Sequence, residues 1–153
     1  MGRIAAPIKF LGAQGEFHVF DTKVKWDQPI RLKLLFENIP PVRISSATDG
    51  YRLRVDRQEL EPAMDMGEFG STKLLDATEL LKIDSGQVIQ RVRSIDDGKG
   101  TIVGLAFQKS QKEFLCVWIA GGEIGWGPQS DLEKVWFGEA SSPIIGCDFY
   151  VTH

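Results

Sequence analysis

Most of the chain alternates between apolar and polar residues with a period of two, the pattern of strands that bury one face and expose the other. The alternation runs through PIRLKLLF at residues 29–36 and, with Val103, Leu105 and Phe107 in step, through TIVGLAF. The run FLCVWIA at residues 114–120 is apolar in both phases, which is typical of a central strand covered on both faces. These patterns predict a mainly β chain.

Turn signals separate the predicted strands. Pro40 and Pro41 end the first of them, because proline does not fit a central ladder. TDG at residues 48–50 and DDGKG at residues 96–100 have the composition of hairpin turns. We interpret GGEIGWG at residues 121–127 as the turn that follows the central strand.

Helical signals are sparse. VIQRVRSI at residues 88–95 fits helical spacing, but its β-branched residues and the turn after it favour a strand. DATELLK places Asp76 at an N-cap position with Glu79 three residues on, and SDLEKVWF repeats this capping pattern with Ser130 and Glu133. Each pattern predicts a helix of one or two turns.

These elements fit a single domain over residues 1–153, a compact antiparallel sheet or barrel with one or two short helices. A further interpretation rests on a loose internal match, in which LLFENIPPVRISSATDGYRL aligns with LAFQKSQKEFLCVWIAGGEIGW. In that interpretation, residues 1–75 and 80–153 are two β-meander pseudo-repeats.

Composition and the start of the chain bear on the compartment. Hydrophobic residues make up 42% and charged residues 25% of the 153 residues, which are ordinary globular values. No run approaches the roughly 18 apolar residues of a membrane span, and MGRIAAPIKFLG is unlike a signal peptide. We therefore expect a soluble cytoplasmic protein without membrane contact, whose Cys116 and Cys147 are reduced, buried thiols.

No motif points to catalysis, a cofactor or a metal. His18 has no GxSxG serine to activate, and the chain has only one other histidine, His153, and no cysteine pair at zinc-ligand spacing. GGEIGWG lacks the Lys-Ser or Lys-Thr ending of a phosphate loop, and the turn itself explains Asp96 and Asp97. We therefore expect no catalytic residue, no metal and no cofactor. An enzyme is a further hypothesis, which a pocket that joins His18 to acidic residues would favour.

The net charge of −3 hides an asymmetry. Residues 1–58 contain ten Lys or Arg and six Asp or Glu, a charge of +4, whereas residues 59–153 contain eight and fifteen, a charge of −7. A face formed by the polar phase of the early strands would contact nucleic acid or an acidic protein, or would pair with the acidic half. The cations of this predicted basic face are Lys23, Lys25, Arg31, Lys33, Arg43, Arg52 and Arg54.

The segment GQVIQRVRSIDDGKGTIVGLAF…FLCVWIAGGEIGWGPQSDLEKV, residues 86–135, resembles a small SH3-like barrel of the Tudor or KOW kind. The shared order is a valine-rich strand, a Gly-x-Gly turn, a Val-Gly strand, a Val-x-Trp strand, an acidic-Gly turn and a helical turn. The resemblance covers about a third of the chain. It implies binding of peptides or nucleic acids through aromatic residues, here Trp118 and Trp126, without chemistry, although the family's full aromatic cage is not visible.

At the level of class alone, the chain also resembles small, acidic, mostly-β toxin-immunity proteins of bacteria. Our leading hypothesis is a non-enzymatic protein-binding domain, an immunity or adaptor protein, that acts through an acidic surface containing tryptophan. The alternative is a nucleic-acid-binding module that uses the basic face in residues 23–54. The predicted partner-binding residues are Glu123, Trp126, Asp131, Glu133 and Trp136.

Overall fold

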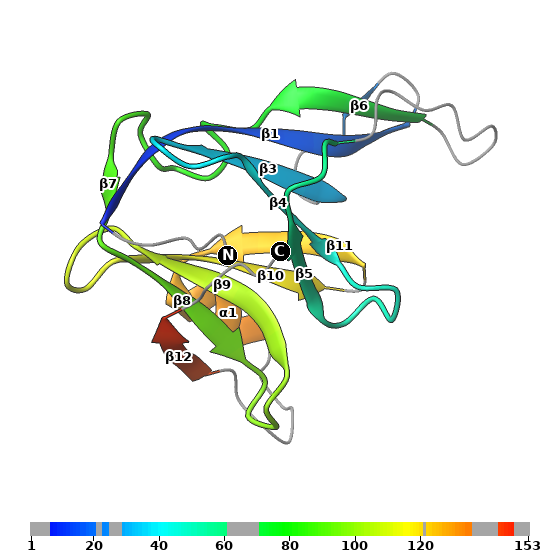
Figure 1. Ribbon diagram of the computed structural model, residues 1–153. Coiled ribbons are helices and arrows are strands. Elements are labelled where there is room, and N and C mark those ends of the chain that lie inside the picture. The colour runs from blue at the N-terminus through cyan, green and yellow to red at the C-terminus, as the bar shows by residue number, and fades with distance from the viewer. Residues whose placement is uncertain are drawn as a thin grey trace.

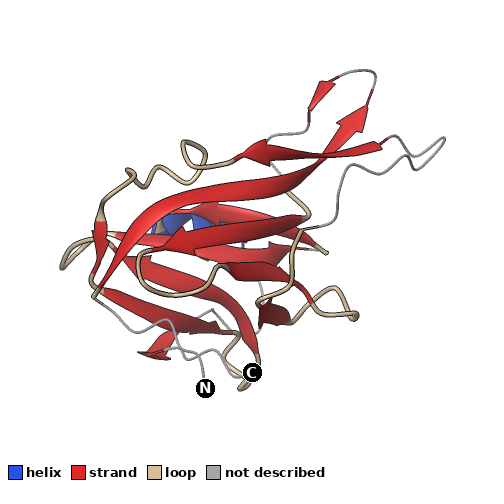
Figure 2. Cartoon of the chain, turned by 45° about the horizontal axis from the view of Figure 1, so that its top comes forward, coloured by secondary structure: helices blue, strands red, loops and turns tan. Residues whose placement is uncertain are grey.

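Two antiparallel sheets and one short helix make up the part of the chain that the computed structural model describes (Figure 1). Figure 2 shows how strongly strands dominate this part. The predicted fold class, a β-rich chain of antiparallel strands with a short helix, is confirmed. The described residues are 7–20, 23–24, 29–60, 71–120, 122–135 and 144–148.

The first sheet is built around β1 (Ile8–Phe20), a strand of 13 residues that has neighbours on both edges. One path of paired strands has the order β2-β1-β3-β4-β5, and β6 and β7 also pair with β1. The other strands are β2 (Lys23–Val24), β3 (Arg31–Phe36), β4 (Val42–Ser46), β5 (Leu53–Asp56), β6 (Ser71–Asp76) and β7 (Val88–Ile89).

The second sheet has five strands in the order β11-β10-β9-β8-β12. Its strand β8 follows β7 after a single residue, so the chain passes directly from one sheet to the other. The predicted strand at residues 88–95 is therefore confirmed, divided between β7 and β8. The bounds are β8 (Arg91–Asp96), β9 (Ile102–Gln108), β10 (Phe114–Ala120), β11 (Glu123–Gly127), β12 (Ile144–Asp148) and, for the helix, α1 (Gln129–Val135).

The two sheets pack face to face over a shared hydrophobic core (Figure 1). Phe36 of the first sheet stacks on Phe107 of the second, with ring centroids 6.3 Å apart, and Phe10 meets Phe36 edge-on at 6.0 Å. Offset and edge-on aromatic pairs stabilise a core beyond the area that they bury. Leu32 and Leu34 are also buried, which confirms the inward phase predicted for β3.

A second apolar layer lies on the other face of β10, under α1. Cys116 and Trp118 of β10 cluster there with Leu132 of the helix, whereas Val117 faces the core between the sheets. The central strand predicted at residues 114–120 is thus confirmed, with both of its faces covered. Cys116 is buried, as expected, and the side chain of Cys147 lies outside the described residues.

The sheets meet again at the turn that precedes β11. The Gly122 amide donates to the Gly50 carbonyl at 3.1 Å, which joins the β10–β11 turn to the β4–β5 turn. Two residues further on, the Ile124 amide donates to the Pro29 carbonyl at 2.9 Å. Gly50 and Gly122 both have positive φ, at 71° and 86°, a conformation that glycine adopts without strain. These bonds close the first sheet onto the edge of the second.

Two sequence interpretations are wrong at this edge of the second sheet. GGEIGWG is not simply a turn, because Glu123–Gly127 forms β11 and pairs with β10 over five residues. Val103 is also out of step with Leu105, since a bulge in the β8–β9 register turns Val103 toward the α1 layer while Leu105 faces the core between the sheets.

The two predicted helices have different outcomes. The helix of DATELLK is wrong, because residues 78–82 form only turns. Asp76 does accept the Thr78 amide through Oδ1 at 2.8 Å, as an N-cap would, but no helix follows it. The Thr78 hydroxyl also accepts the Ala13 amide at 3.0 Å, which ties this turn to β1. The helix of SDLEKVWF is confirmed, but it begins at Gln129, so Ser130 lies inside its first turn rather than at the N-cap.

The single-domain and pseudo-repeat interpretations stay predictions. The two segments aligned in the sequence do form three-stranded antiparallel meanders, β3-β4-β5 and β9-β10-β11. Any two β-meanders share this much, so the similarity does not establish a duplication. No helix in the described residues is long and apolar enough to cross a membrane.

Candidate binding cleft and basic face

Three of the five predicted partner-binding residues have described side chains, and these three do not all line one cleft. Trp126 and Asp131 line the same cleft. Glu123 lies at the other end of β11, in the opposite phase of the strand, with a carboxylate oxygen 4.0 Å from His18 Nε2. The side chain of Glu133 and all of Trp136 lie outside the described residues.

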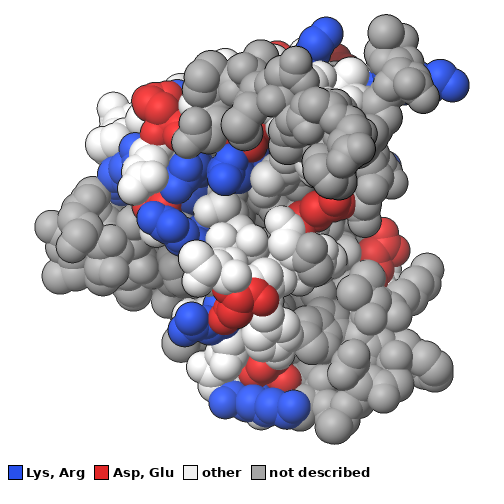
Figure 3. Space-filling model, turned by 90° about the vertical axis from the view of Figure 1, so that its right-hand side faces the viewer, with Lys and Arg blue, Asp and Glu red and all other residues white. Residues whose placement is uncertain are grey.

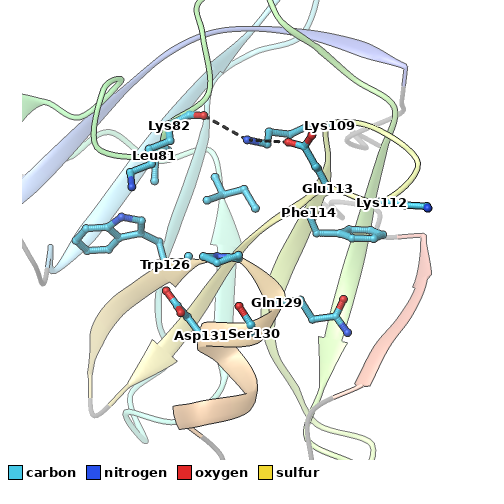
Figure 4. Close-up of a pocket in the computed structure, with 13 residues that line it drawn as sticks. Leu81, Lys82, Lys109, Lys112, Glu113, Phe114, Trp126, Gln129, Ser130 and Asp131 are labelled. Carbon is cyan, nitrogen blue, oxygen red and sulfur yellow. Dashed lines mark hydrogen bonds and ion pairs between the residues drawn. The ribbon is translucent and has the colours of Figure 1, made fainter.

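The cleft has a volume of about 540 Å³ and is bounded by three segments that are distant in sequence, residues 81–82, 109–115 and 126–131. Figure 4 shows the Trp126 indole on one side and the Phe114 ring on the other. This volume is within the range of about 300–1,000 Å³ that is typical of ligand pockets. The cleft therefore has aromatic walls and enough room for several side chains of a partner.

Lysines set the charge of the cleft. Lys82, Lys109 and Lys112 line it together with Glu113 and Asp131, so the described lining has one more positive charge than negative charges. Lys109 Nζ lies 3.9 Å from Glu113 Oε2 and donates to the Lys82 carbonyl at 3.4 Å (Figure 4). The sequence predicts an acidic surface around Trp126, whereas the described lining of this cleft is slightly positive.

Trp126 is partly buried, with one side against the core between the sheets and the other on the cleft. It shares this phase of β11 with Ile124, which is fully buried. The intervening Gly125 lies against the Trp118 ring, since a Cβ at this position would come within 2.4 Å of Trp118 Nε1. The glycine beside Trp126 is therefore explained by the close approach of the β10 indole rather than by a turn.

The backbone of β11 is available next to the cleft. β11 is the edge strand of the second sheet, and its only partner within that sheet is β10. Alternate residues of an antiparallel strand direct their N–H and C=O groups to the same side. Because the Ile124 amide points away from β10, to Pro29, the Trp126 groups point the same way. Among the described residues, none bonds the Trp126 amide on that outer side.

The predicted basic face forms only in part, because carboxylates neutralise most of its cations. Arg31, Lys33, Arg43, Arg52 and Arg54 all pair with carboxylates, namely those of Glu16, Glu59, Asp56, Asp49 and again Asp56. Three of these four acids belong to the basic half of the sequence, so the pairing is mostly local rather than with the acidic half. Lys23 is exposed, and Lys25 lies outside the described residues. Figure 3 shows Lys and Arg side chains interspersed with Asp and Glu.

Arg43 is the most deeply buried of these cations, with 6% of the residue exposed. Its Nε and Nη2 donate to both carboxylate oxygens of Asp56, at 2.9 and 2.7 Å, and Nη2 also donates to Gln58 Oε1 at 3.0 Å. Desolvation works to raise the pKa of Asp56, but the hydrogen bonds from Arg43 and from the Gln58 amide outweigh it and hold this pKa below its usual value. Arg43 is thus a structural cation rather than a free one.

The structure adds residues to the cleft that the sequence analysis did not single out, chiefly Leu81, Lys82 and Phe114. Lys82 is the last residue of the segment predicted to be a helix, and its positive φ of 55° ends the turn that replaces that helix. Phe114 is the first residue of the central strand, and from the sequence alone its aromatic ring indicates a position in the core. The polar connection QKSQKE between β9 and β10 was the one available signal, since it supplies Lys109 and Lys112.

Nothing in the described geometry assembles a metal site: no group of three His, Cys, Asp or Glu residues comes together among these residues. Asp96 and Asp97 stabilise the β8–β9 turn, as predicted, because their Oδ1 atoms accept hydrogen bonds from the amides of Gly98 and Lys99 at 2.7 and 2.8 Å.

No protein-family model, curated protein or solved structure matches this chain. The resemblances to SH3-like barrels and to immunity proteins therefore stay predictions.

Proposed function

We propose that this chain is a protein-binding domain that captures an extended, acidic segment of its partner in the cleft beside β11. The observation that carries the proposal is the outer edge of β11 next to the cleft, where the backbone groups of Trp126 point away from β10 and have no partner among the described residues. A partner segment would add a strand there, and main-chain hydrogen bonds would provide much of its affinity.

The side chains around this edge specify the partner's chemistry. Trp126 and Phe114 would receive apolar side chains, and Lys82 and Lys109 would attract carboxylates. Side chains alternate along an extended segment, so those that face the cleft would be apolar and acidic, while the others would face solvent. An adaptor and an immunity protein would both fit this description, and each remains a hypothesis.

The nucleic-acid-binding alternative has weaker support. Affinity for nucleic acid comes largely from cations that are free to neutralise phosphates, and five of the seven predicted cations are paired with carboxylates. We expect little binding to oligonucleotides at physiological ionic strength. Tight binding that weakens steeply with added salt would favour this alternative instead.

The test begins with selection from a random peptide library displayed on phage, followed by fluorescence anisotropy with the selected peptides. We expect peptides rich in Asp or Glu that alternate with apolar residues. Lys82→Glu should weaken their binding about tenfold, because it reverses one charge at the rim. Trp126→Ala should weaken binding roughly 30-fold or more if Trp126 anchors the segment. Thermal unfolding must accompany both measurements, since Trp126 also packs against the core.

Lys99→Glu is the matched control, because Lys99 is exposed on the β8–β9 turn and does not line the cleft. Amide hydrogen exchange supplies a second readout: peptide should protect the Trp126 amide and leave Ile124, already bonded to Pro29, unchanged. Equal losses for Lys82→Glu and Lys99→Glu, or no protection at Trp126, would contradict the proposal. So would a concentration-dependent dimer that protects Trp126 without peptide, since β11 would then pair with a second copy.

A further inference from the structure

A second concave site lies on the other side of the contact between the two sheets. It has a volume of about 520 Å³, and Arg31, Arg43 and Arg54 line it together with Ser45. Gly50 and Gly122, whose turns are joined by a hydrogen bond, also line it. Its lining is polar and cationic, which sets it apart from the aromatic cleft on β11.

The strand register explains why three arginines converge here. Arg31 lies opposite Glu16 on β1, and Arg54 lies opposite Ser45 on β4. Arg43 is two residues before Ser45 on the same strand, so it has the same phase. The intervening residues of these strands face the core between the sheets, as fully buried Leu32 and Ile44 show. The guanidinium groups therefore share the face of the sheet that points away from the core.

Among the described residues, the pocket has an excess of positive charge. Its three arginines are paired there with two carboxylates, since Glu16 pairs with Arg31 and Asp56 is shared by Arg43 and Arg54. An arginine has five N–H donors. Most of those of Arg43 are used. Among the described residues, Arg54 makes one contact, from Nε to Asp56 at 3.1 Å, and Arg31 makes one, from Nη1 to Glu16 at 2.5 Å.

Ser45 provides an independent observation. The residue is only 4% exposed, and among the described residues none bonds its hydroxyl. A serine hydroxyl can donate one hydrogen bond and accept two, so this one is available to a group bound in the pocket. The Ser45 side chain has the phase of the arginines and lines their pocket. A bound group with acceptor oxygens would accept a hydrogen bond from this hydroxyl.

We propose that this pocket binds the phosphate group of a small phosphorylated molecule. Arg31, Arg54 and Ser45 would donate from three positions, which suits a tetrahedral anion with several acceptor oxygens better than a planar carboxylate with two. Arg43 is a positioning residue, because its bidentate contact fixes Asp56, and Asp56 in turn orients Arg54. The volume of the pocket exceeds that of a phosphate ion, so the organic part of the molecule would also fit inside.

The experiment is a titration of the labelled protein, followed by the amide resonances of residues 45–50 and 122. Sodium phosphate is compared with sodium chloride at equal ionic strength, and a nucleoside monophosphate and a short single-stranded oligonucleotide form two further arms. We expect saturable shifts with phosphate and none with chloride. The nucleoside monophosphate should bind more tightly than phosphate, because it also fills the rest of the pocket.

Two arginine variants of the same hairpin separate a site from general electrostatics. Arg54→Gln should weaken binding of the monophosphate about tenfold or more, as expected for the loss of charge-assisted hydrogen bonds. Arg52→Gln removes the same charge, but Arg52 pairs with Asp49 outside the pocket, so its effect should stay below about twofold. Arg54 is half exposed, and Asp56 still has its ion pair with Arg43 when Arg54 is replaced. The Arg54→Gln variant should therefore fold.

Ser45→Ala tests the donor set without any change of charge, and we expect it to weaken the monophosphate about fivefold. The proposal is overturned if phosphate gives no saturable shift, or if Arg52→Gln and Arg54→Gln weaken binding equally. Binding of the oligonucleotide alone would also overturn it, since the ligand would then be a polymer that lies across the face. Unchanged binding in Ser45→Ala would also count against it, because the proposed donor set includes this hydroxyl.

Discussion

Replacing Gly104 by alanine would test the packing of the second sheet at its tightest point. Gly104 lies on β9, between Ile95 of β8 and Trp118 of β10. A Cβ at this position would come within 2.3 Å of the Val117 carbonyl oxygen, 3.0 Å of Trp118 Cα and 3.2 Å of Ile95 Cδ1. The nearest two atoms belong to the backbone of the central strand and cannot turn aside as a flexible side chain would.

The distance sets the size of the effect. Ordinary contacts of a Cβ begin at 3.4 Å, so β9 and β10 would have to separate locally by about 1 Å. Overpacking costs about 1–3 kcal/mol, and weakened ladder hydrogen bonds add about 0.5–1.5 kcal/mol each. Alanine also reduces the conformational entropy of the unfolded chain relative to glycine, which offsets about 0.4–1 kcal/mol of this loss of stability. We expect the free energy of unfolding to fall by about 3 kcal/mol and Tm by about 6–12 °C, measured by urea and thermal denaturation.

Gly12→Ala is the matched control within the first sheet. Its added Cβ would meet only Thr78 Oγ1, at 3.1 Å, and Gly12 does not have a positive φ. Its stability should therefore stay within about 1 kcal/mol of the parent. If Gly104→Ala is as stable as Gly12→Ala, then β9 and β10 do not approach each other as closely as described. The argument for a central strand packed on both faces would fail with that result.

Two further substitutions address the contact between the sheets. Phe107→Ala should lower the free energy of unfolding by about 3–5 kcal/mol, because it leaves a cavity beside Phe36; a loss below about 1 kcal/mol in urea titrations would contradict this packing. The Tyr51 hydroxyl, 2.5 Å from Asp97 Oδ2, is the main cause that lowers the pKa of Asp97 below its usual 3.8. A lowered carboxyl pKa stabilises the fold above the unfolded pKa, and this contribution is lost as pH falls through the folded pKa. Tyr51→Phe should thus destabilise the protein at neutral pH, and the difference should shrink below about pH 4; a constant difference from pH 7 to pH 3 would refute the assignment.

The strands of this fold were largely predictable because each buries a pattern that is local in sequence. The alternation in β3 and the apolar run of β10 determine which faces are covered, whatever the neighbouring strands are. Val103 was placed in the wrong phase because a bulge depends on how two strands pair, and no single strand records it. The helix expected after Asp76 failed for a similar reason, since the tie between Thr78 and β1 spans 65 residues.

The candidate sites were less predictable because they depend on long-range proximity. The polar phase of the early strands correctly indicated an outward cationic face, but only the fold shows that Glu16 and Asp56 share that face. The sequence singles out the tryptophan beside the glycines, yet its surroundings come from the turn at Lys82 and the connection at Lys109. The charge of a composite surface cannot be inferred from the charge of the sequence half that contains one of its residues.

The edge position of β11 explains why two such different sites lie close together. An edge strand must cover its outward backbone groups or leave them to a partner. The first sheet covers them at Ile124 and approaches again at Gly122, and the arginine pocket forms where the outer face of that sheet meets this contact. Among the described residues beyond Ile124, the first sheet no longer covers the outer backbone groups of β11, and the cleft begins at Trp126. Because fully buried Ile124 separates the two sites, and because they share no lining residue, a negative result at one would leave the argument for the other intact.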